Sequence, residues 1–268
     1  MLASCEADKG SNATPGLVVE GWIDNGRFPV VILTRTVPIT GEYQPIDNLT
    51  DYAERWATVR VSDGKREVTL IATYDEKYFP PYVYTTSEMR GETGKTYRLT
   101  VDCTDGSHAE AVTSIPASVP IDSFELKNVG EADTLRQLYG FITDTRDSMR
   151  YYKLFTHVTG DDYGYLSSYL GIVSSDLLPA DGRVAVNQGR INLRKDFTPY
   201  FAIGDTVLVK LACMDAPAYK FWREFEDILT LSRNPLFPVT NNMSSNVSGA
   251  LGYWFGYGST FYTVTVDP

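Results

Sequence analysis

The sequence predicts a mainly all-β protein, with an N-terminal immunoglobulin-like antiparallel sandwich and a second β-rich domain that carries one α-helix. Short runs rich in β-branched and aromatic residues recur at the spacing typical of an antiparallel sandwich. The 21 glycines and 14 prolines punctuate these runs, as the turns of a many-stranded protein require. At 268 residues, the chain is too long for one immunoglobulin-sized sandwich and suits two domains.

The first domain is expected at residues 17–116, after a polar segment at 1–16. Its strands come in pairs, and turn residues such as Asp24-Asn-Gly26 and Ser62-Asp-Gly64 separate the members of a pair. Such residues favour tight connections between antiparallel strands. The expected pairs are 17–23 with 28–36, 57–61 with 67–73, and 96–102 with 109–115.

The second domain is expected at residues 117–268. The segment Ile115-Pro-Ala-Ser-Val-Pro-Ile121 is the best boundary, because its two prolines enforce an extended backbone. A helix is predicted near 216–232, where apolar residues recur at intervals of three and four, Asp215 can cap the first turn and Asn234-Pro235 ends the pattern. The expected strands are 123–129, 138–143, 151–159, 169–174, 182–187, 206–214 and 260–266.

Two aromatic clusters are candidates for binding a ligand or a partner. The first surrounds Pro80-Pro81 and includes Tyr78, Phe79 and Tyr82, with Tyr74 and Tyr84 beside them. The second consists of Tyr253, Trp254 and Tyr257, which alternate with glycines. Tyrosine and tryptophan are enriched at interfaces because they offer a large area with a polar tip. Packing in the core or between domains is the alternative for both clusters, and no periodicity shows what the second cluster faces.

The composition excludes several function classes. Lys and Arg number 24 against 34 Asp and Glu, and a net charge of −10 argues against nucleic-acid binding. With two histidines, three cysteines and no metal, phosphate or nucleophile motif, we expect no zinc, iron or copper, no cofactor and no catalytic residue. Calcium stays open, because oxygen ligands abound although no loop spacing supports a site. A hydrolase built on two carboxylates stays open. For Cys103 and Cys213, both buried thiols and a disulfide that joins the two halves of the chain stay open.

The N-terminus predicts where the protein is located in the cell. Leu2-Ala-Ser-Cys5 resembles the lipobox of bacterial lipoproteins, in which the cysteine is lipidated. The polar residues 6–15 that follow are typical of a flexible tether. We therefore expect Cys5 to carry a lipid that is the only attachment to a membrane. The apolar stretch that normally precedes a lipobox is missing, which makes residues 1–16 a lipobox remnant and tether.

Several pieces of the chain together resemble the lipoprotein family catalogued as domain of unknown function 4249. The resemblance implies an exported lipoprotein of Gram-negative bacteria, encoded beside a TonB-dependent outer-membrane receptor, with an accessory role in nutrient uptake. It assigns no catalytic residue, and only Cys5 transfers, as the lipidation site. The matching pieces, in order, are 17–26 with 31–34, 59–64, 94–99, 111–116, 151–153, 204–207, 219–222 and the block from Asn234-Pro235 to Gly252.

Three functions follow as expectations. The first is a non-enzymatic lipoprotein of the outer membrane, periplasmic or surface-exposed, that captures a peptide or glycan or docks on the receptor through exposed aromatic loops. The second is a structural or adhesion module, which a large concave pocket would argue against. The third, a hydrolase, would require a cleft that holds a perturbed carboxylate pair.

Overall fold

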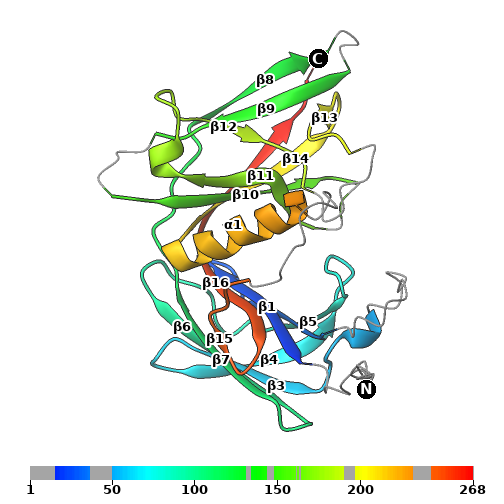
Figure 1. The fold of residues 1–268 in the computed structure, drawn as a ribbon, viewed down its shortest axis with the longest axis vertical. Helices are drawn as coiled ribbons and strands as arrows, with labels where there is room; N and C mark the ends of the chain where they lie inside the picture. The colour runs from blue at the N-terminus through cyan, green and yellow to red at the C-terminus, as the bar shows by residue number, and fades with distance from the viewer. Residues whose placement is uncertain are drawn as a thin grey trace, which may run out of the picture.

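A computed structural model describes residues 16–36, 50–130, 134–143, 148–160, 162, 164–189, 197–231 and 243–267. It confirms an all-β fold with one long helix (Figure 1). The elements are β1 (Leu17–Asp24), β2 (Val30–Arg35), β3 (Ala57–Ser62), β4 (Glu67–Tyr74), β5 (Tyr82–Thr85), β6 (Thr96–Cys103), β7 (His108–Ser114), β8 (Ser123–Val129), β9 (Leu135–Phe141), β10 (Tyr151–Val158), β11 (Leu166–Ser174), the 3-10 turn η2 (Ser175–Leu177), β12 (Arg183–Val186), β13 (Phe201–Ala202), β14 (Thr206–Met214), α1 (Ala216–Leu231), β15 (Val247–Ser248) and β16 (Leu251–Thr265).

The first module contains β1 to β7 and folds as a sandwich-like pair of sheets. Its strands follow the order β16-β1-β2-β5-β4-β3-β6-β7-β15. Strand β4 belongs to both sheets, since residues 67–70 pair with β3 and residues 71–74 pair with β5. A strand that switches sheets in this way makes the corner of a sandwich. The buried core between the sheets takes side chains from β1 to β7, and from Val247 and Trp254 near the C-terminus.

The second module packs two further sheets face to face. One has the order β11-β10-β14-β16, and in the other β9 pairs with β8, β12 and β13. Between them lies a second buried cluster that includes Leu138, Tyr152, Leu154, Val209 and Leu211. Alternate residues of β10 and β14 point into this cluster, as the period of two along a strand requires.

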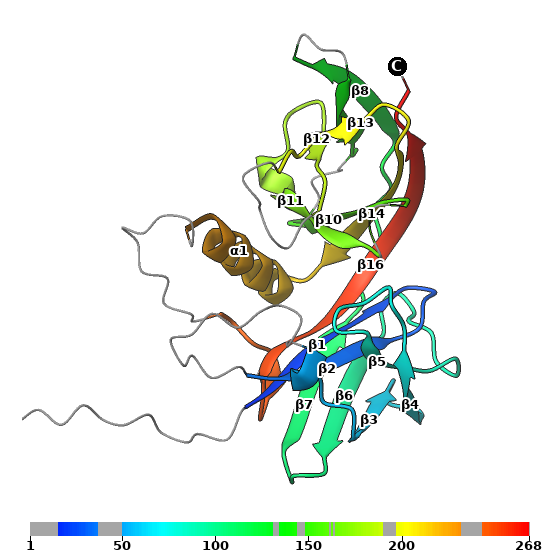
Figure 2. The same ribbon diagram turned by 90° about the vertical axis from the view of Figure 1, so that its right-hand side faces the viewer.

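The C-terminal strand β16 belongs to both modules, which corrects the expected division of the chain. Residues 251–257 pair in parallel with β1, and residues 258–265 pair with β14 of the second module. Figure 2 shows β16 as one curved ribbon that runs from the lower module into the upper one. The expected domain 117–268 therefore differs from the second module of the structure, because residues 247–257 pair with strands of the first module.

The glycine-rich aromatic block forms the first half of β16, and its aromatic residues are not exposed. Tyr253, Trp254 and Tyr257 are 3%, 0% and 2% exposed. Trp254 fills the core of the first module and donates from Nε1 to the carbonyl oxygen of Tyr97 at 3.2 Å. Tyr253 and Tyr257 point to the opposite face of the sheet, toward α1. The expectation that these three residues stand on an exposed loop is wrong, since residues 253–257 are buried in a strand.

Helix α1 lies where the sequence predicts it and covers the aromatic face of the sheet. Asp215 caps it, since Oδ1 of Asp215 accepts from the backbone N–H of Ala218 at 2.9 Å. Phe221 and Trp222 pack against Phe255, with ring centroids 5.3 and 5.5 Å apart. The helix is therefore a packing element of the sheet, as its wide apolar stripe indicates.

The two cysteines that the structure describes are both free and buried. Cys103 belongs to the core of the first module, and Cys213 belongs to the core of the second. They therefore act as small apolar side chains in separate cores, and no disulfide joins them.

Candidate functional site

The β4–β5 connection and the segment before β3 carry partly or fully exposed aromatic side chains, which we call the aromatic rim: Trp56, Tyr74, Phe79 and Tyr82. Trp56, Tyr74 and Phe79 are 76%, 59% and 51% exposed, and Tyr82 is half-buried. Large apolar side chains gathered at one place on a surface are typical of an interaction site.

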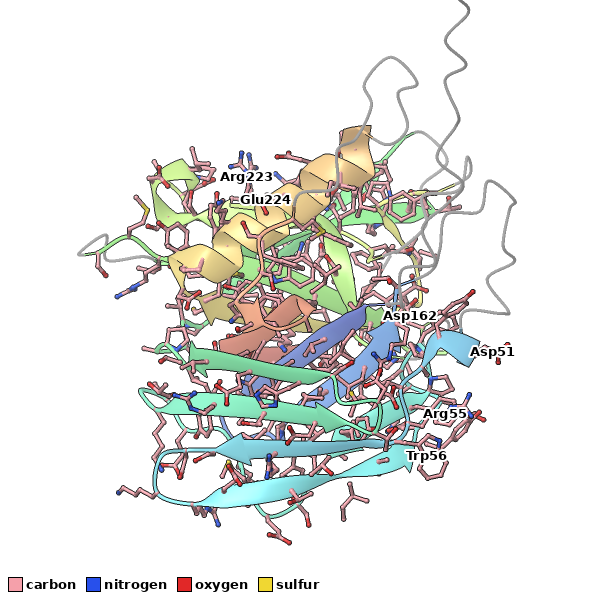
Figure 3. The ribbon with its side chains drawn as sticks, turned by 60° about the horizontal axis from the view of Figure 1, so that its bottom comes forward. Asp51, Arg55, Trp56, Asp162, Arg223 and Glu224 are labelled. Atoms are coloured by element: carbon pink, nitrogen blue, oxygen red, sulfur yellow. The ribbon has the colours of Figure 1, made fainter. Side chains whose placement is uncertain are left out.

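The pairing of β4 with β5 positions two residues of the aromatic rim. Tyr74 ends β4 and Tyr82 begins β5, and the two residues are directly paired, with ring centroids 5.5 Å apart. The guanidinium carbon of Arg55 lies 4.0 Å from the ring centroid of Tyr82, which joins the segment before β3 to the same surface. In Figure 3, Arg55 and Trp56 project together from the segment before β3.

The loop 75–81 that carries Phe79 is closed by its own hydrogen bonds. The backbone N–H of Asp75 donates to the carbonyl oxygen of Pro81 at 2.9 Å, and the N–H of Tyr78 donates to the carbonyl oxygen of Asp75 at 3.2 Å. Tyr78 turns inward, and its ring centroid lies 5.9 Å from that of Trp22. Burial, followed by the carboxylates of Asp75 and Asp24, raises the pKa of Tyr78. Tyr78 and Tyr82 are therefore half-buried and Phe79 is exposed, and a binding role for the three residues stays a prediction.

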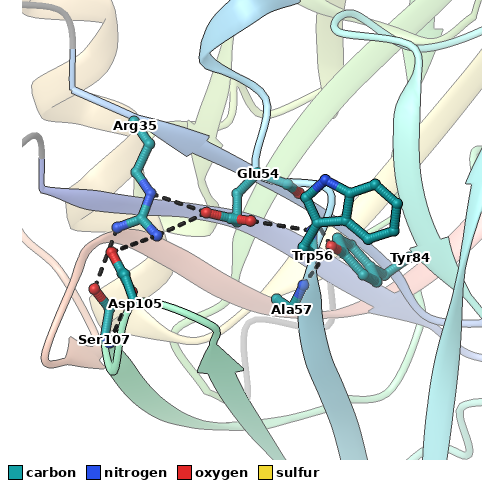
Figure 4. Close-up of polar contacts among 7 residues, drawn as sticks. All are labelled: Arg35, Glu54, Trp56, Ala57, Tyr84, Asp105 and Ser107. Atoms are coloured by element: carbon teal, nitrogen blue, oxygen red, sulfur yellow. Dashed lines mark hydrogen bonds and ion pairs between the residues drawn. The ribbon is translucent and has the colours of Figure 1, made fainter.

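Trp56 was not among the residues that the sequence singled out, and a polar network explains its position (Figure 4). Its backbone N–H donates to Glu54 Oε1 at 3.0 Å. The other oxygen of that carboxylate accepts from Arg35 at 2.7 Å, and Arg35 also contacts Asp105 at 2.9 Å. The backbone beneath Trp56 is thus fixed while its ring stays in solvent. No sequence pattern indicates this, because Arg35 and Asp105, which hold the Glu54 carboxylate, lie far from Trp56 in the sequence.

Two lysines are buried in ion pairs. Lys210 lies 2.7 Å from Asp24, and both side chains are 7% exposed. Lys153 lies 2.6 Å from Glu226 of α1. Burial lowers the pKa of each lysine, and its carboxylate partner opposes that shift. Each ammonium group is paired with a carboxylate that favours its protonated form. We therefore interpret the two pairs as structural and not as proton acceptors for a reaction.

The described residues offer little that resembles a catalytic or metal centre. In that part of the chain, no group of three or more His, Cys, Asp or Glu side chains is placed to hold a metal ion. A shallow hollow of about 430 Å³ lies beside the first turn of α1, and its lining carries one lysine and no carboxylate pair. The hollow is lined by Ala216, Pro217, Lys220, Ser244, Ser245, Asn246 and Tyr253.

The comparison with protein families decides the assignment. The family model described as Domain of unknown function (DUF4249) matches residues 5–263. The chain belongs to the DUF4249 family. No curated protein matches this DUF4249 chain. Cys5 lies at the start of the matched region and outside the residues that the structure describes, so its lipidation stays a prediction. Across the described ranges, no helix of the DUF4249 protein combines the length and apolar character needed to cross a membrane.

Proposed function

We propose that this protein is a non-enzymatic lipoprotein of a bacterial outer membrane, anchored through Cys5, that docks on a TonB-dependent receptor and assists nutrient uptake. The observation that carries the docking role is the aromatic rim, where exposed rings stand on a rigid backbone. The resemblance that the sequence shows to exported lipoproteins supports the anchor and the partner.

The rim has the physical properties of a docking surface. Aromatic side chains are enriched in interface cores, and one well-buried aromatic anchor commonly supplies ~2 kcal/mol or more of binding energy. The hydrogen bonds within loop 75–81 and the pairing of Tyr74 with Tyr82 hold the rings before a partner arrives. Such pre-organisation reduces the entropy lost on binding.

Substitutions at Phe79 and Tyr78 separate binding from packing. Phe79→Ala should lower the affinity for the receptor about thirtyfold while leaving thermal stability unchanged, because its ring is in solvent. Tyr78→Ala is the matched control, because its ring packs against Trp22 and its removal should lower the melting temperature. Phe79→Ala with unchanged receptor affinity would contradict the docking role.

Site-specific photo-crosslinking tests the partner in cells. A photoreactive residue at position 79 should give an adduct with the receptor, and the same residue at Leu177, 65% exposed in the second module, should not. Equal adducts from both positions, or none from position 79, would refute the docking surface. The anchor is tested separately, since Cys5→Ala in the full-length gene product should release the protein from the membrane fraction.

A further inference from the structure

Within the aromatic rim, Trp56 is connected to the point where the chain enters the fold. The backbone N–H of Gly16 donates to Thr36 at 2.8 Å, and Leu17 pairs with Arg35 at the start of β1. Arg35 binds Glu54, which in turn accepts from the backbone of Trp56. The exposed indole of Trp56 is therefore linked through two residues to the first position of β1.

A lipid on Cys5 would hold this end of the molecule close to a bilayer. Residues 6–16 separate Cys5 from the fold. Eleven residues span at most about 40 Å when fully extended, and about 18 Å as a flexible chain. A tether of that length raises the effective concentration of the rim at the lipid surface, so a contact too weak to bind a free protein becomes populated.

The side chains of this end suit the boundary between lipid and water. Tryptophan is enriched at membrane interfaces because its ring is apolar and its N–H is polar, and Trp56 is 76% exposed. Arg55 precedes it, is exposed, and carries a guanidinium of the kind that binds phosphate groups. Asp51 is also exposed in this segment and carries the opposite charge to Arg55.

The overall charge determines which force acts. A chain of net charge −10 is repelled from an anionic surface, so electrostatic attraction does not bring the module to the bilayer. Insertion of the indole at the interface does not depend on that charge. A contact made by Trp56 should therefore form on zwitterionic lipid and change little with salt.

We propose that Trp56 and Arg55 form a bilayer-contact point that seats the first module on the lipid surface. This inference rests on the proposed lipidation of Cys5. It assigns the rim two neighbouring tasks: Trp56 contacts lipid, and Phe79 faces the receptor beside it.

The probe is the acylated full-length protein in phosphatidylcholine vesicles, with or without brominated acyl chains. Brominated chains quench a tryptophan that reaches the acyl region. The protein has four tryptophans, and the other three are partly or fully buried. Wild-type emission should therefore be quenched through Trp56, and Trp56→Phe should reduce that quenching several-fold. The quenching should stay within a factor of about two between about 50 mM and about 500 mM salt, a range that shortens the Debye length about threefold.

A matched variant controls for non-specific contact. In Trp56→Phe combined with Leu177→Trp, the new indole is similarly exposed but lies on the second module. It should not be quenched. Equal quenching of wild type and Trp56→Phe, or equal quenching at position 177, would overturn the contact. A third outcome would also overturn the contact: no quenching in lipid alone, with Trp56 shielded from solvent only after the receptor is added. That outcome would assign Trp56 to the receptor interface.

The anchor and the contact fail in different ways. An intact mass without acyl chains on Cys5 would refute the proposed anchoring, and this inference with it. An acylated protein whose Trp56 is not quenched would refute only the bilayer contact.

Discussion

Replacing Asp24 by asparagine tests how much the ion pair between Asp24 and Lys210 stabilises the contact between the two modules, which we call the joint. Asp24 ends β1 in the first module, and Lys210 lies in β14 of the second. The Lys210 Nζ atom is 5.0 Å from the ring centroid of Phe155 and 4.7 Å from that of Tyr257. Ser259 donates a short hydrogen bond to Asp24. Asparagine keeps the shape of the aspartate but removes the counter-charge, so the buried ammonium loses its partner.

The structure bounds the cost of this substitution. Breaking a buried ion pair by removing one partner commonly costs about 3–5 kcal/mol. Lys210 can also lose its proton, which removes the unpaired buried charge. Discharging a lysine from its ordinary pKa of 10.5 at pH 7 costs about 5 kcal/mol, at about 1.4 kcal/mol per pKa unit. The free energy of unfolding should therefore fall by about 3–5 kcal/mol at pH 7.

The dependence on pH gives the sign of the effect. In Asp24→Asn, we expect burial to hold Lys210 neutral in the folded state, while the unfolded state binds a proton up to the ordinary pKa of 10.5. Stability rises with pH wherever the unfolded state binds more protons. The deficit relative to wild type should therefore shrink between pH 7 and pH 10, by as much as about 1.4 kcal/mol per pH unit.

Urea unfolding of wild type and variant at pH 7 and pH 9 measures both quantities, with coincident fluorescence and circular dichroism transitions as the test of two-state behaviour. The double variant Asp24→Asn with Lys210→Met is the matched control, because it removes the buried charge and should recover most of the loss. A deficit below about 1 kcal/mol at pH 7, or a double variant no more stable than Asp24→Asn, would refute a buried ion pair that stabilises the joint.

Three further predictions concern stability and charge. Gly252→Ala should lower the free energy of unfolding by at least about 2 kcal/mol, because φ is +105° and a Cβ would lie 1.9 Å from a carbonyl oxygen of β1; wild-type stability in urea would contradict this. Trp254→Ala should cost about 3–5 kcal/mol in the same assay, and Phe79→Ala less than about 0.5 kcal/mol, so similar values for the two would contradict their burial. By NMR titration, the pKa of His108 should lie above 6.5, because Asp102 binds its ring at 2.7 Å, and Asp102→Asn should lower it; an unchanged value would exclude that contact.

The sequence predicts local features of the first module well, because those features depend on neighbouring residues. The turn after β3 is an example, where Oδ1 of Asp63 accepts from the backbone N–H groups of Lys65 and Arg66, each at 3.0 Å. The alternation in β3 and β6 likewise places Val59 and Leu99 in the core. Such signals lie within a few residues of the element that they determine.

Long-range pairing explains what the sequence does not reveal. Strand β16 lacks an alternating pattern at residues 253–257 because these residues are buried on both faces of the sheet. Gly256 is required there, since a Cβ would lie 2.4 Å from the carbonyl oxygen of Ser114, which is distant in the chain. The short strand β5 (Tyr82–Thr85) follows two prolines and gives no alternation long enough to recognise. Phe79 and Trp56 differ in the same way. The neighbouring Pro80-Pro81 indicates the exposed loop of Phe79 from the sequence, whereas the position of Trp56 depends on Arg35, which is distant in the chain.

The parallel pairing of β1 with β16 has a mechanical consequence. Seven residue pairs join the two strands, from Val18 with Leu251 to Asp24 with Tyr257. Strand β1 begins where the chain enters the first module, and β16 leaves that module into the second. A pull between the start of β1 and the second module would act along both strands in opposite directions. Their hydrogen bonds would then bear the load together in shear, rather than opening one after another as in a zipper. The geometry suits a protein that must stay folded while its two ends are drawn apart.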